Sequence, residues 1–440
     1  MLSRVEFILS ASLFIMAIFS PRLYSYSYIL WAFVITIVGI GLFFRSWGRS
    51  NENFLQFEPI FAVVALIMGF TFPLFVYPYN EDAAYMFSWG IPYSLNYFNK
   101  GACLTGMGIL AFLSGSSTRN QLSSKYVKSV SSTRVISSKK LSFWLFIILL
   151  CYMLLGGFER YRTIYVEGED GGSFLTYIEV FIIALSQVII ANEVWNTLHR
   201  VEYKIDKSSL LIVVFISLYF MYVGNRTYSL YLLMPLTIFL TTYKYKVNFK
   251  AFVVLIALGV GAMVFIMLFR SRAEFNQELG WYYYLVDLMI PNTTTYLGCE
   301  VVDERGFSYG SSLLGSILGA IPFSQSLLSI LTGIGSETTN SSTIFTVYLG
   351  SKTGTGTNFV ADSYLAFGSL GVFFISYYGG RFLNLVKNRS QYSYYYLVVY
   401  VVYCGFAVYM VRASFLYPIR FIVYSLLFAF INSNLRKKCS

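Results

Sequence analysis

The sequence has few charged residues, a single histidine and no closely spaced cysteine pair. Only 12% of its 440 residues are charged, about half of the roughly 25% found in soluble domains, which argues against a soluble globular protein. With His199 as the only histidine, neither a histidine metal site nor a Ser-His triad is expected. The five cysteines are scattered, so we expect no disulfide framework. No motif calls for a metal or a cofactor.

The sequence contains many long apolar runs. Hydrophobic residues make up 57% of the chain, and a membrane-spanning helix needs about 20 largely apolar residues. The sequence therefore predicts an all-α polytopic membrane protein, a single integral-membrane domain over 1–440 with about 12 transmembrane helices. The first run has no small-x-small cleavage site and is expected to be a retained span. The predicted spans are 5–20, 24–44, 57–77, 101–116, 141–157, 173–198, 208–223, 227–243, 251–270, 359–386, 394–411 and 414–434.

The distribution of basic residues predicts the orientation of these spans. With both termini in the cytoplasm, the segments between spans on that side collect 20 of the 32 lysines and arginines, including a basic cytoplasmic loop at 117–140. Most acidic residues fall on the other side, as the positive-inside rule requires. We attribute the net charge of +11 to this orientation and to contact with anionic lipid, and not to nucleic-acid binding.

The segment 271–358 is predicted to be a large external loop within the membrane domain. It contains the apolar stretch 308–335. If that stretch were one full span, the basic tail at 436–438 would lie outside, against the charge rule. We therefore expect interfacial or re-entrant helices there.

Arginines dominate among the basic residues that do not follow the orientation rule. The planar guanidinium group binds phosphate through two parallel hydrogen bonds, so a lipid pyrophosphate is a natural ligand for such a group. Any single arginine at a span end can instead reach lipid headgroups or pair with an acid. We expect several of them to face one external cavity. The candidates are Arg160, Arg162, Arg226, Arg270, Arg272, Arg412 and Arg420.

Four carboxylates are candidates for a base or a charge-stabilising group. Asp362 opens the tenth predicted span next to a Gly/Thr-rich loop, where an acid in the membrane is hard to explain structurally. Glu337 and Glu300 lie in the predicted external loop. Glu179 lies within the sixth predicted span, where we expect a buried partner for an arginine. The loop with Gly354 lacks the Gly-Lys-Ser/Thr ending of a P-loop.

Several short motifs resemble the Wzy-type O-antigen polymerases, also called oligosaccharide repeat unit polymerases. The similarity covers most of the chain and includes the many-span plan and the large external loop. Arg160 to Gly171 fits an Arg-x10-Gly pattern of the family, and Asp362 stands where the family often has Glu. The other motifs are the turn Gly224-Asn225-Arg226, the span end at Arg270, and the series Gly354-Thr-Gly-Thr-Asn358, Asp362, Phe367-Gly368 and Gly371.

The resemblance implies a membrane-embedded glycosyltransferase on the outer face of a bacterial inner membrane. It implies that the enzyme joins undecaprenyl-pyrophosphate-linked oligosaccharide repeat units and works with a chain-length-determining co-polymerase. Asp362, Arg226 and Arg270 would be catalytic, with Asp362 acting on the acceptor hydroxyl and the arginines on the pyrophosphate. The substrate- and pyrophosphate-binding residues would be Arg160, Arg162, Arg272, Arg412, Arg420 and Glu337.

Other classes of membrane protein remain open from the sequence. Twelve spans also suit a flippase for the same lipid-linked units, although such a protein would carry basic residues along its span interiors. An O-antigen ligase shares the plan and the lipid donor, but such ligases place a histidine in the large external loop, whereas His199 is mapped inside. A non-catalytic membrane protein would leave the external arginines unexplained.

Overall fold

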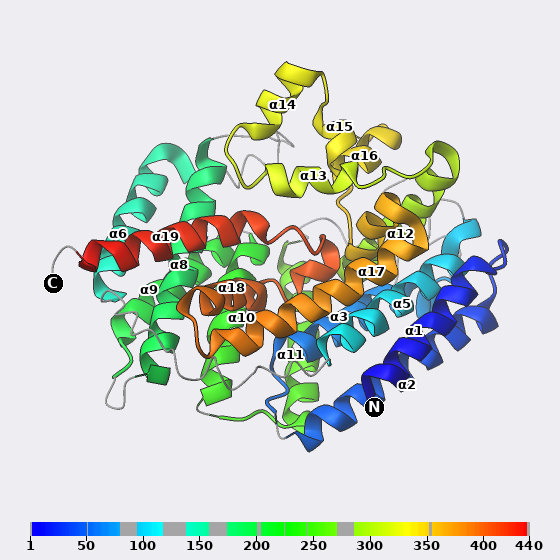
Figure 1. Ribbon diagram of the computed structural model, residues 1–440, viewed down its shortest axis with the longest axis horizontal. Coiled ribbons are helices and arrows are strands. Elements are labelled where there is room, and N and C mark those ends of the chain that lie inside the picture. The colour runs from blue at the N-terminus through cyan, green and yellow to red at the C-terminus, as the bar shows by residue number, and fades with distance from the viewer. Residues whose placement is uncertain are drawn as a thin grey trace.

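The computed structural model is helical, and no strand occurs among the residues that it describes (Figure 1). Helices take up 83% of the structure, which confirms the predicted all-α class. Positions 118–137 of the predicted basic loop 117–140 lie outside the described residues. The described residues are 2–50, 52–79, 95–117, 138–157, 174–199, 204–223, 225–243, 245–270, 286–351 and 354–437.

Each of the twelve apolar runs overlaps a helix. Within the described part of the chain, five helices are long and apolar enough to cross a membrane by length and composition. They are α2 (Tyr26–Arg49), α3 (Phe57–Thr71) with its π-helical end η1 (Phe72–Val76), α6 (Ser138–Tyr152) with η4 (Met153–Gly157), α8 (Phe174–His199) and α17 (Phe359–Ser390). The chain thus has the helices of a membrane protein, whereas the count of twelve spans stays a prediction.

The remaining apolar runs form further helices of the same bundle (Figure 1). They are α1 (Leu2–Ile18), α5 (Phe98–Ser116), α9 (Lys207–Tyr222), α10 (Arg226–Tyr243), α11 (Phe249–Arg270), α18 (Tyr394–Gly405) and α19 (Ile419–Lys437).

Helix α5 lies inside the bundle, with nearly all of its side chains buried between α1, α2, α3 and α17. Glycines bring its backbone against that of α17. A Cβ atom added at Gly115 would lie 2.0 Å from the carbonyl oxygen of Tyr377, and one added at Gly380 would lie 2.1 Å from that of Phe112. Small residues allow such close approach between helices in membranes, where packing replaces the hydrophobic effect as the driving force.

The two ends of the bundle differ in charge. At one end, which we call the site end, α17 and α19 begin close to the segment 286–351, and α10 begins near the start of α19. At the opposite end, Lys387 pairs with Glu52 at 2.9 Å and Glu58 at 3.6 Å. Many basic residues gather at this opposite end, including Arg45, Arg49, Lys139, Lys140, Lys204, Lys207, Lys246, Lys250 and Arg389.

The segment 286–351 of the predicted external loop folds into five helices. The longest, α12 (Val286–Arg305), packs into the bundle against α3, α5 and α17, and its fully buried Tyr296 lies with its ring centroid 4.4 Å from that of Phe98. This part of the predicted loop is therefore built into the helical core. The other four are α13 (Ser311–Leu318), α14 (Ser324–Thr332), α15 (Ser336–Thr339) and α16 (Ser341–Tyr348).

The apolar stretch 308–335 is divided between α13 and α14. These helices have 8 and 9 residues, which at 1.5 Å per residue gives about 12–14 Å, too short to cross a hydrocarbon core of about 30 Å. Helix α14 has no buried residue and projects from the edge of the bundle in Figure 1. Its exposed side chains include Leu327, Ile330 and Leu331.

Asn358 fixes the start of α17 to α12. Its side-chain oxygen caps the helix by accepting hydrogen bonds from the backbone N–H groups of Val360 at 3.0 Å and Ala361 at 2.7 Å. Its amide nitrogen donates to the carbonyl oxygen of Pro291 and to the hydroxyls of Thr294 at 2.9 Å and Thr295 at 2.8 Å. One buried side chain therefore satisfies both the helix terminus and the neighbouring helix.

A kink divides α17 shortly after this cap. Gly368 has φ 67° and ψ −153°, a conformation that is essentially limited to glycine. The carbonyl oxygen of Leu365 accepts a hydrogen bond from the backbone N–H of Ser308 at 2.9 Å, and the ring of Phe307 packs where a Cβ of Gly368 would lie. The kink thus leaves a short first part of α17 under the loop that leads to α13.

Replacement of Gly380 by alanine is expected to destabilise the protein by about 1–3 kcal/mol, because the added Cβ forces the backbones of α5 and α17 apart. The measurement is unfolding of the purified protein in detergent. Gly379→Ala is the matched control, since its Cβ would lie 3.3 Å from a ring carbon of Phe415, which can shift. Equal stability of the two variants would contradict the backbone contact.

Replacement of Asn358 by alanine is expected to destabilise more than Asn340→Ala. Asn340 only caps α16, by accepting a hydrogen bond from the backbone N–H of Ser342 at 3.0 Å, and such a cap contributes about 0.5–2 kcal/mol. Asn358→Ala also removes the amide donor that links α17 to α12, at a further cost of about 0.5–1.5 kcal/mol for each hydrogen bond lost. Detergent unfolding of both variants measures the difference, and an equal loss would argue against the link to α12.

Candidate functional site

Asp362 is buried at the site end, where three separate segments meet. It lies in the first turn of α17 and is 5% exposed. The hydroxyl of Ser341, at the start of α16, and the hydroxyl of Ser414, just before α19, hydrogen-bond its carboxylate. The predicted candidate base is therefore held between α16, α17 and the segment that precedes α19.

Further hydroxyls surround this carboxylate. The hydroxyl of Ser414 lies 3.4 Å from that of Ser316 on α13, and the hydroxyl of Ser341 lies 3.1 Å from that of Thr357. Hydroxyls both donate and accept hydrogen bonds, so they can stabilise a carboxylate and also meet the hydroxyls of a sugar. Asp362 thus lies in a small polar region within an otherwise apolar bundle.

Arg420 lies in a cluster of tyrosines next to this region. Its guanidinium carbon is 5.7 Å from the ring centroid of Tyr417 and 5.1 Å from that of Phe421, and its terminal nitrogen lies 3.4 Å from the hydroxyl of Tyr417. The ring of Tyr417 is 5.3 Å from that of Tyr409. Stacking on aromatic rings holds a guanidinium group without neutralising it.

Arg412 joins the same cluster from the other end of a short turn. It ends η6 (Tyr409–Arg412), and both Arg412 and Arg420 act electrostatically on the hydroxyl of Tyr409. Between them, Phe415 packs with its ring centroid 5.6 Å from that of Phe359 and 5.8 Å from that of Phe112. The structure thus brings these two predicted arginines together, in the same short segment as Ser414.

Arg226 begins α10 beside this cluster. The side chain of Asn225 caps the helix by accepting a hydrogen bond from the backbone N–H of Tyr228 at 3.2 Å. The hydroxyl of Tyr228 interacts electrostatically with both Arg420 and Glu179. Arg226 therefore also lies at the site end, at the start of the helix that carries Tyr228.

Glu179 is buried and has a hydrogen bond from a tyrosine. The hydroxyl of Tyr152 donates to its carboxylate at 2.8 Å. It also acts electrostatically on the hydroxyls of Tyr219 and Tyr228. Glu179 therefore belongs to the tyrosine-rich region that holds Arg420.

Other predicted site residues are not brought together by the described structure. Glu337 is exposed on α15. Arg270 ends α11, and its side chain lies outside the described residues, as do Arg160, Arg162 and Arg272.

A second polar cluster lies at the end of α12, and Glu300 is its one member among the candidates named from the sequence. The hydroxyl of Tyr97 donates to Asp303 at 2.9 Å, and Lys100 lies 3.8 Å from the same carboxylate. The hydroxyl of Tyr348 donates to Glu300 at 3.3 Å, and Arg305 lies 4.9 Å from the centroid of the Tyr348 ring. The helical spacing of the acids at 300, 303 and 304 was the available signal, because it places them on neighbouring faces of one turn.

The tyrosines of this cluster are hydrogen-bond donors at neutral pH. Burial, and then the hydrogen bond to Asp303, raises the pKa of Tyr97 above its usual value. Burial, and then the hydrogen bond to Glu304, raises the pKa of Tyr348 in the same direction. Both hydroxyls therefore stay protonated.

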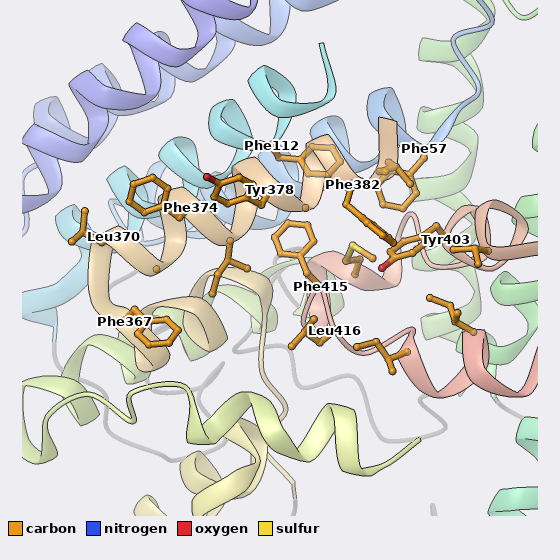
Figure 2. Close-up of a pocket in the computed structure, with 18 of the residues that line it drawn as sticks. Phe57, Phe112, Phe367, Leu370, Phe374, Tyr378, Phe382, Tyr403, Phe415 and Leu416 are labelled. Atoms are coloured by element: carbon orange, nitrogen blue, oxygen red, sulfur yellow. The ribbon is translucent and has the colours of Figure 1, made fainter. Parts of the chain in front are cut away.

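A long apolar groove runs along the part of α17 that follows Asp362, from Phe367 to Leu383. Its cavity volume is about 810 Å³, and its lining residues come mainly from α17, α18, α19 and the segment 410–419. Figure 2 shows the labelled side chains, which belong to α17 (Phe367, Leu370, Phe374, Tyr378 and Phe382) and to the walls around it. Those on α17 recur every three or four residues, so they share one face of the helix. The groove is also lined by Phe415 and Leu416, which directly follow Ser414 (Figure 2).

The histidine of the chain lies away from this region. His199 ends α8 at the opposite end, where its ring nitrogens lie 3.0 Å from the carbonyl oxygen of Trp195 and 3.2 Å from that of Gln391. Among the described residues, no group of three His, Cys, Asp or Glu side chains could hold a metal ion.

No protein-family profile, no curated protein and no solved structure matches the chain.

Proposed function

We propose that this protein is the integral-membrane polymerase that joins lipid-linked oligosaccharide repeat units into a surface polysaccharide. The observation that carries the proposal is that Phe415 and Leu416 line an apolar groove and directly follow Ser414, the hydrogen-bond partner of Asp362. The same short segment carries Arg412 and Arg420 at its two ends. A buried carboxylate, fixed positive charge and a lipid-facing groove are what a transferase with a polyprenyl pyrophosphate donor requires.

The groove suits the hydrocarbon tail of such a donor. From Leu370 to Leu383 the α17 wall covers about 20 Å, which is a large part of a hydrocarbon core of about 30 Å. The lining is made of aromatic and aliphatic side chains, and half-exposed Phe374 and Tyr378 form part of its rim. A polyprenyl chain can therefore enter from the side, from the surrounding bilayer.

The arginines suit the leaving group. When the bond between the anomeric carbon and the phosphate oxygen breaks, the electron pair stays on the pyrophosphate. Arg412 and Arg420 provide fixed positive charge for this group at the site end. Because Arg420 rests on the rings of Tyr417 and Phe421, its charge stays available to an anion.

Asp362 suits the role of base for the acceptor. The non-reducing-end hydroxyl of the next repeat unit attacks the anomeric carbon, and its proton passes to the Asp362 carboxylate. Ser341 and Ser414 hold that carboxylate in position. The products are the lengthened chain on the lipid of the acceptor and free polyprenyl pyrophosphate.

The charge of the two ends supports the orientation expected from the sequence. Basic residues gather at the opposite end, so the positive-inside rule places that end in the cytoplasm and the site end outside. In this arrangement both termini are cytoplasmic, the twelve helices span a bacterial inner membrane, and 271–358 lies on the external side. A chain-length-determining co-polymerase is the expected protein partner.

The position of His199 favours a polymerase over an O-antigen ligase, which shares the lipid donor. The ligase interpretation calls for a histidine in the large external loop, and this side chain lies at the opposite end from Asp362. A flippase would need basic groups along its path, whereas the groove is lined by apolar residues.

Arg420→Ala is expected to abolish the long polysaccharide chains and to leave a band with a single repeat unit. Loss of a charge that stabilises the leaving group lowers the rate by roughly 10²–10³-fold. The measurement is a silver-stained gel of surface polysaccharide from a deletion strain that carries the variant, with protein amount checked by immunoblot. Arg389→Ala is the control, since Arg389 bonds the hydroxyl of Tyr396 at the opposite end. A normal ladder from Arg420→Ala would overturn the assignment of this arginine.

Asp362→Asn is expected to give the same pattern, because the amide keeps the size of the side chain but cannot accept the proton; loss of a general base costs roughly 10²–10⁴-fold. Purified protein with a lipid-linked repeat unit tests it directly, through the rate of pyrophosphate-lipid release. Glu337→Gln serves as the comparison, since Glu337 is exposed on α15. If Asp362→Asn released lipid at the normal rate, Asp362 would not be the base.

A further inference from the structure

A second apolar cavity lies on the other side of the segment that carries Arg412. Its volume is about 190 Å³, and it lies between α3, α10 and α11. Val408 lines this cavity, whereas Met410, two residues later, lines the long groove along α17. The two cavities therefore flank one short stretch of chain at the site end. The cavity is lined by Leu55, Ile60, Val64, Ile67, Met68, Leu230, Met234, Leu255, Ile256, Gly259, Val260 and Val408.

Arg226 stands on the same face of α10 as the cavity wall. Leu230 and Met234 line the cavity, and Arg226 precedes them at intervals of four residues, so all three share one helix face. Because α10 begins at Arg226, this positive charge lies at the site end of the apolar wall. The N-terminus of α10 adds a partial positive charge of its own.

Helix α11 stands apart from its neighbours along this cavity. It is held at the opposite end, where the ring centroid of Phe249 lies 5.6 Å from that of Phe54 and 5.8 Å from that of Phe44. Further along, a Cβ added at Gly259 would meet no atom within 4 Å, and Leu255, which lines the cavity, is 41% exposed. The cavity thus opens to the surface between α11 and the rest of the bundle.

We propose that this second cavity holds a second lipid-linked substrate, a polyprenyl pyrophosphate whose head group binds Arg226. The inference rests on the proposed function, because polymerisation joins two substrates that each carry a polyprenyl pyrophosphate. A bilayer-facing apolar cavity with an arginine at one end matches that ligand in both polarity and charge.

The two cavities have different roles in this scheme. The pyrophosphate of the donor is bonded to the reacting carbon, so it lies next to Asp362, at the end of the long groove. The pyrophosphate of the acceptor is separated from the reacting hydroxyl by a whole repeat unit, so it can lie at Arg226. The long groove therefore takes the donor, and the cavity beside α11 takes the acceptor.

Native mass spectrometry of the purified full-length protein with undecaprenyl pyrophosphate counts the bound lipids. The expected result is two per chain. Gly259→Phe fills the cavity and Leu426→Trp fills the long groove, so each is expected to reduce the count to one. The neighbouring residues give matched controls. Gly261→Phe and Leu427→Trp change positions that line neither cavity, and both are expected to bind two lipids.

A kinetic experiment separates the two sites further. In polymerisation assays with lipid-linked acceptor, Gly259→Phe and Arg226→Ala are expected to raise the acceptor KM roughly tenfold or more, since a charged hydrogen-bond partner is lost or its site is blocked. Gly261→Phe is expected to keep the KM of the unchanged protein.

The possible outcomes distinguish this inference from the proposed function. One bound lipid in the unchanged protein, with polymerisation intact, would overturn the second site alone. Equal displacement of the second lipid by phosphatidylglycerol would overturn it as well, because the cavity would then hold any bilayer lipid. If no polyprenyl pyrophosphate binds and no polymer forms, both proposals fail.

Discussion

Direct backbone contact between α5 and α17 is the constraint on which the rest of the structure depends. Gly115 and Gly380 leave no room for a side chain between these helices, so their axes stay close along the middle of the bundle. Helix α17 carries Asp362 at one end, the wall of the apolar groove along its length, and Lys387 at the other end. A helix held this firmly gives the groove and the carboxylate a fixed relative position, which a transferase site requires.

The start of α17 is fixed by a different kind of interaction. The Asn358 amide joins the helix terminus to α12, and the Gly368 kink turns the first part of the helix toward the loop before α13. Hydrogen bonding at this point matters for stability, because a buried donor or acceptor without a partner costs about 1–3 kcal/mol. The result is a polar region of serines and Asp362 that opens onto an apolar groove. In the proposed function this boundary is where the sugar–phosphate bond breaks.

Much of the fold could be predicted from the sequence, because long apolar runs leave few alternatives to helices in a membrane. The runs at 359–386 and 414–434 correspond to α17 and α19, and the short turn between Arg412 and Arg420 does bring these arginines together. The prediction for 271–358 was incomplete. Helix α12 has a buried face as well as polar ends, and its mean hydropathy is too low to distinguish packing inside the bundle from a place in an external loop.

The sequence by itself determined the helical class of the protein and its membrane character, and it supplied the candidate residues for the proposed site. Hydropathy and charge are local properties, so they can be read along the chain. The tertiary structure alone decided which of those residues meet. It placed Ser341, Asp362 and Ser414 together, left Glu337 at the surface, and formed two apolar cavities on either side of Val408 and Met410. These arrangements depend on glycine contacts and on one asparagine network between distant segments, and such contacts have no signature in local composition.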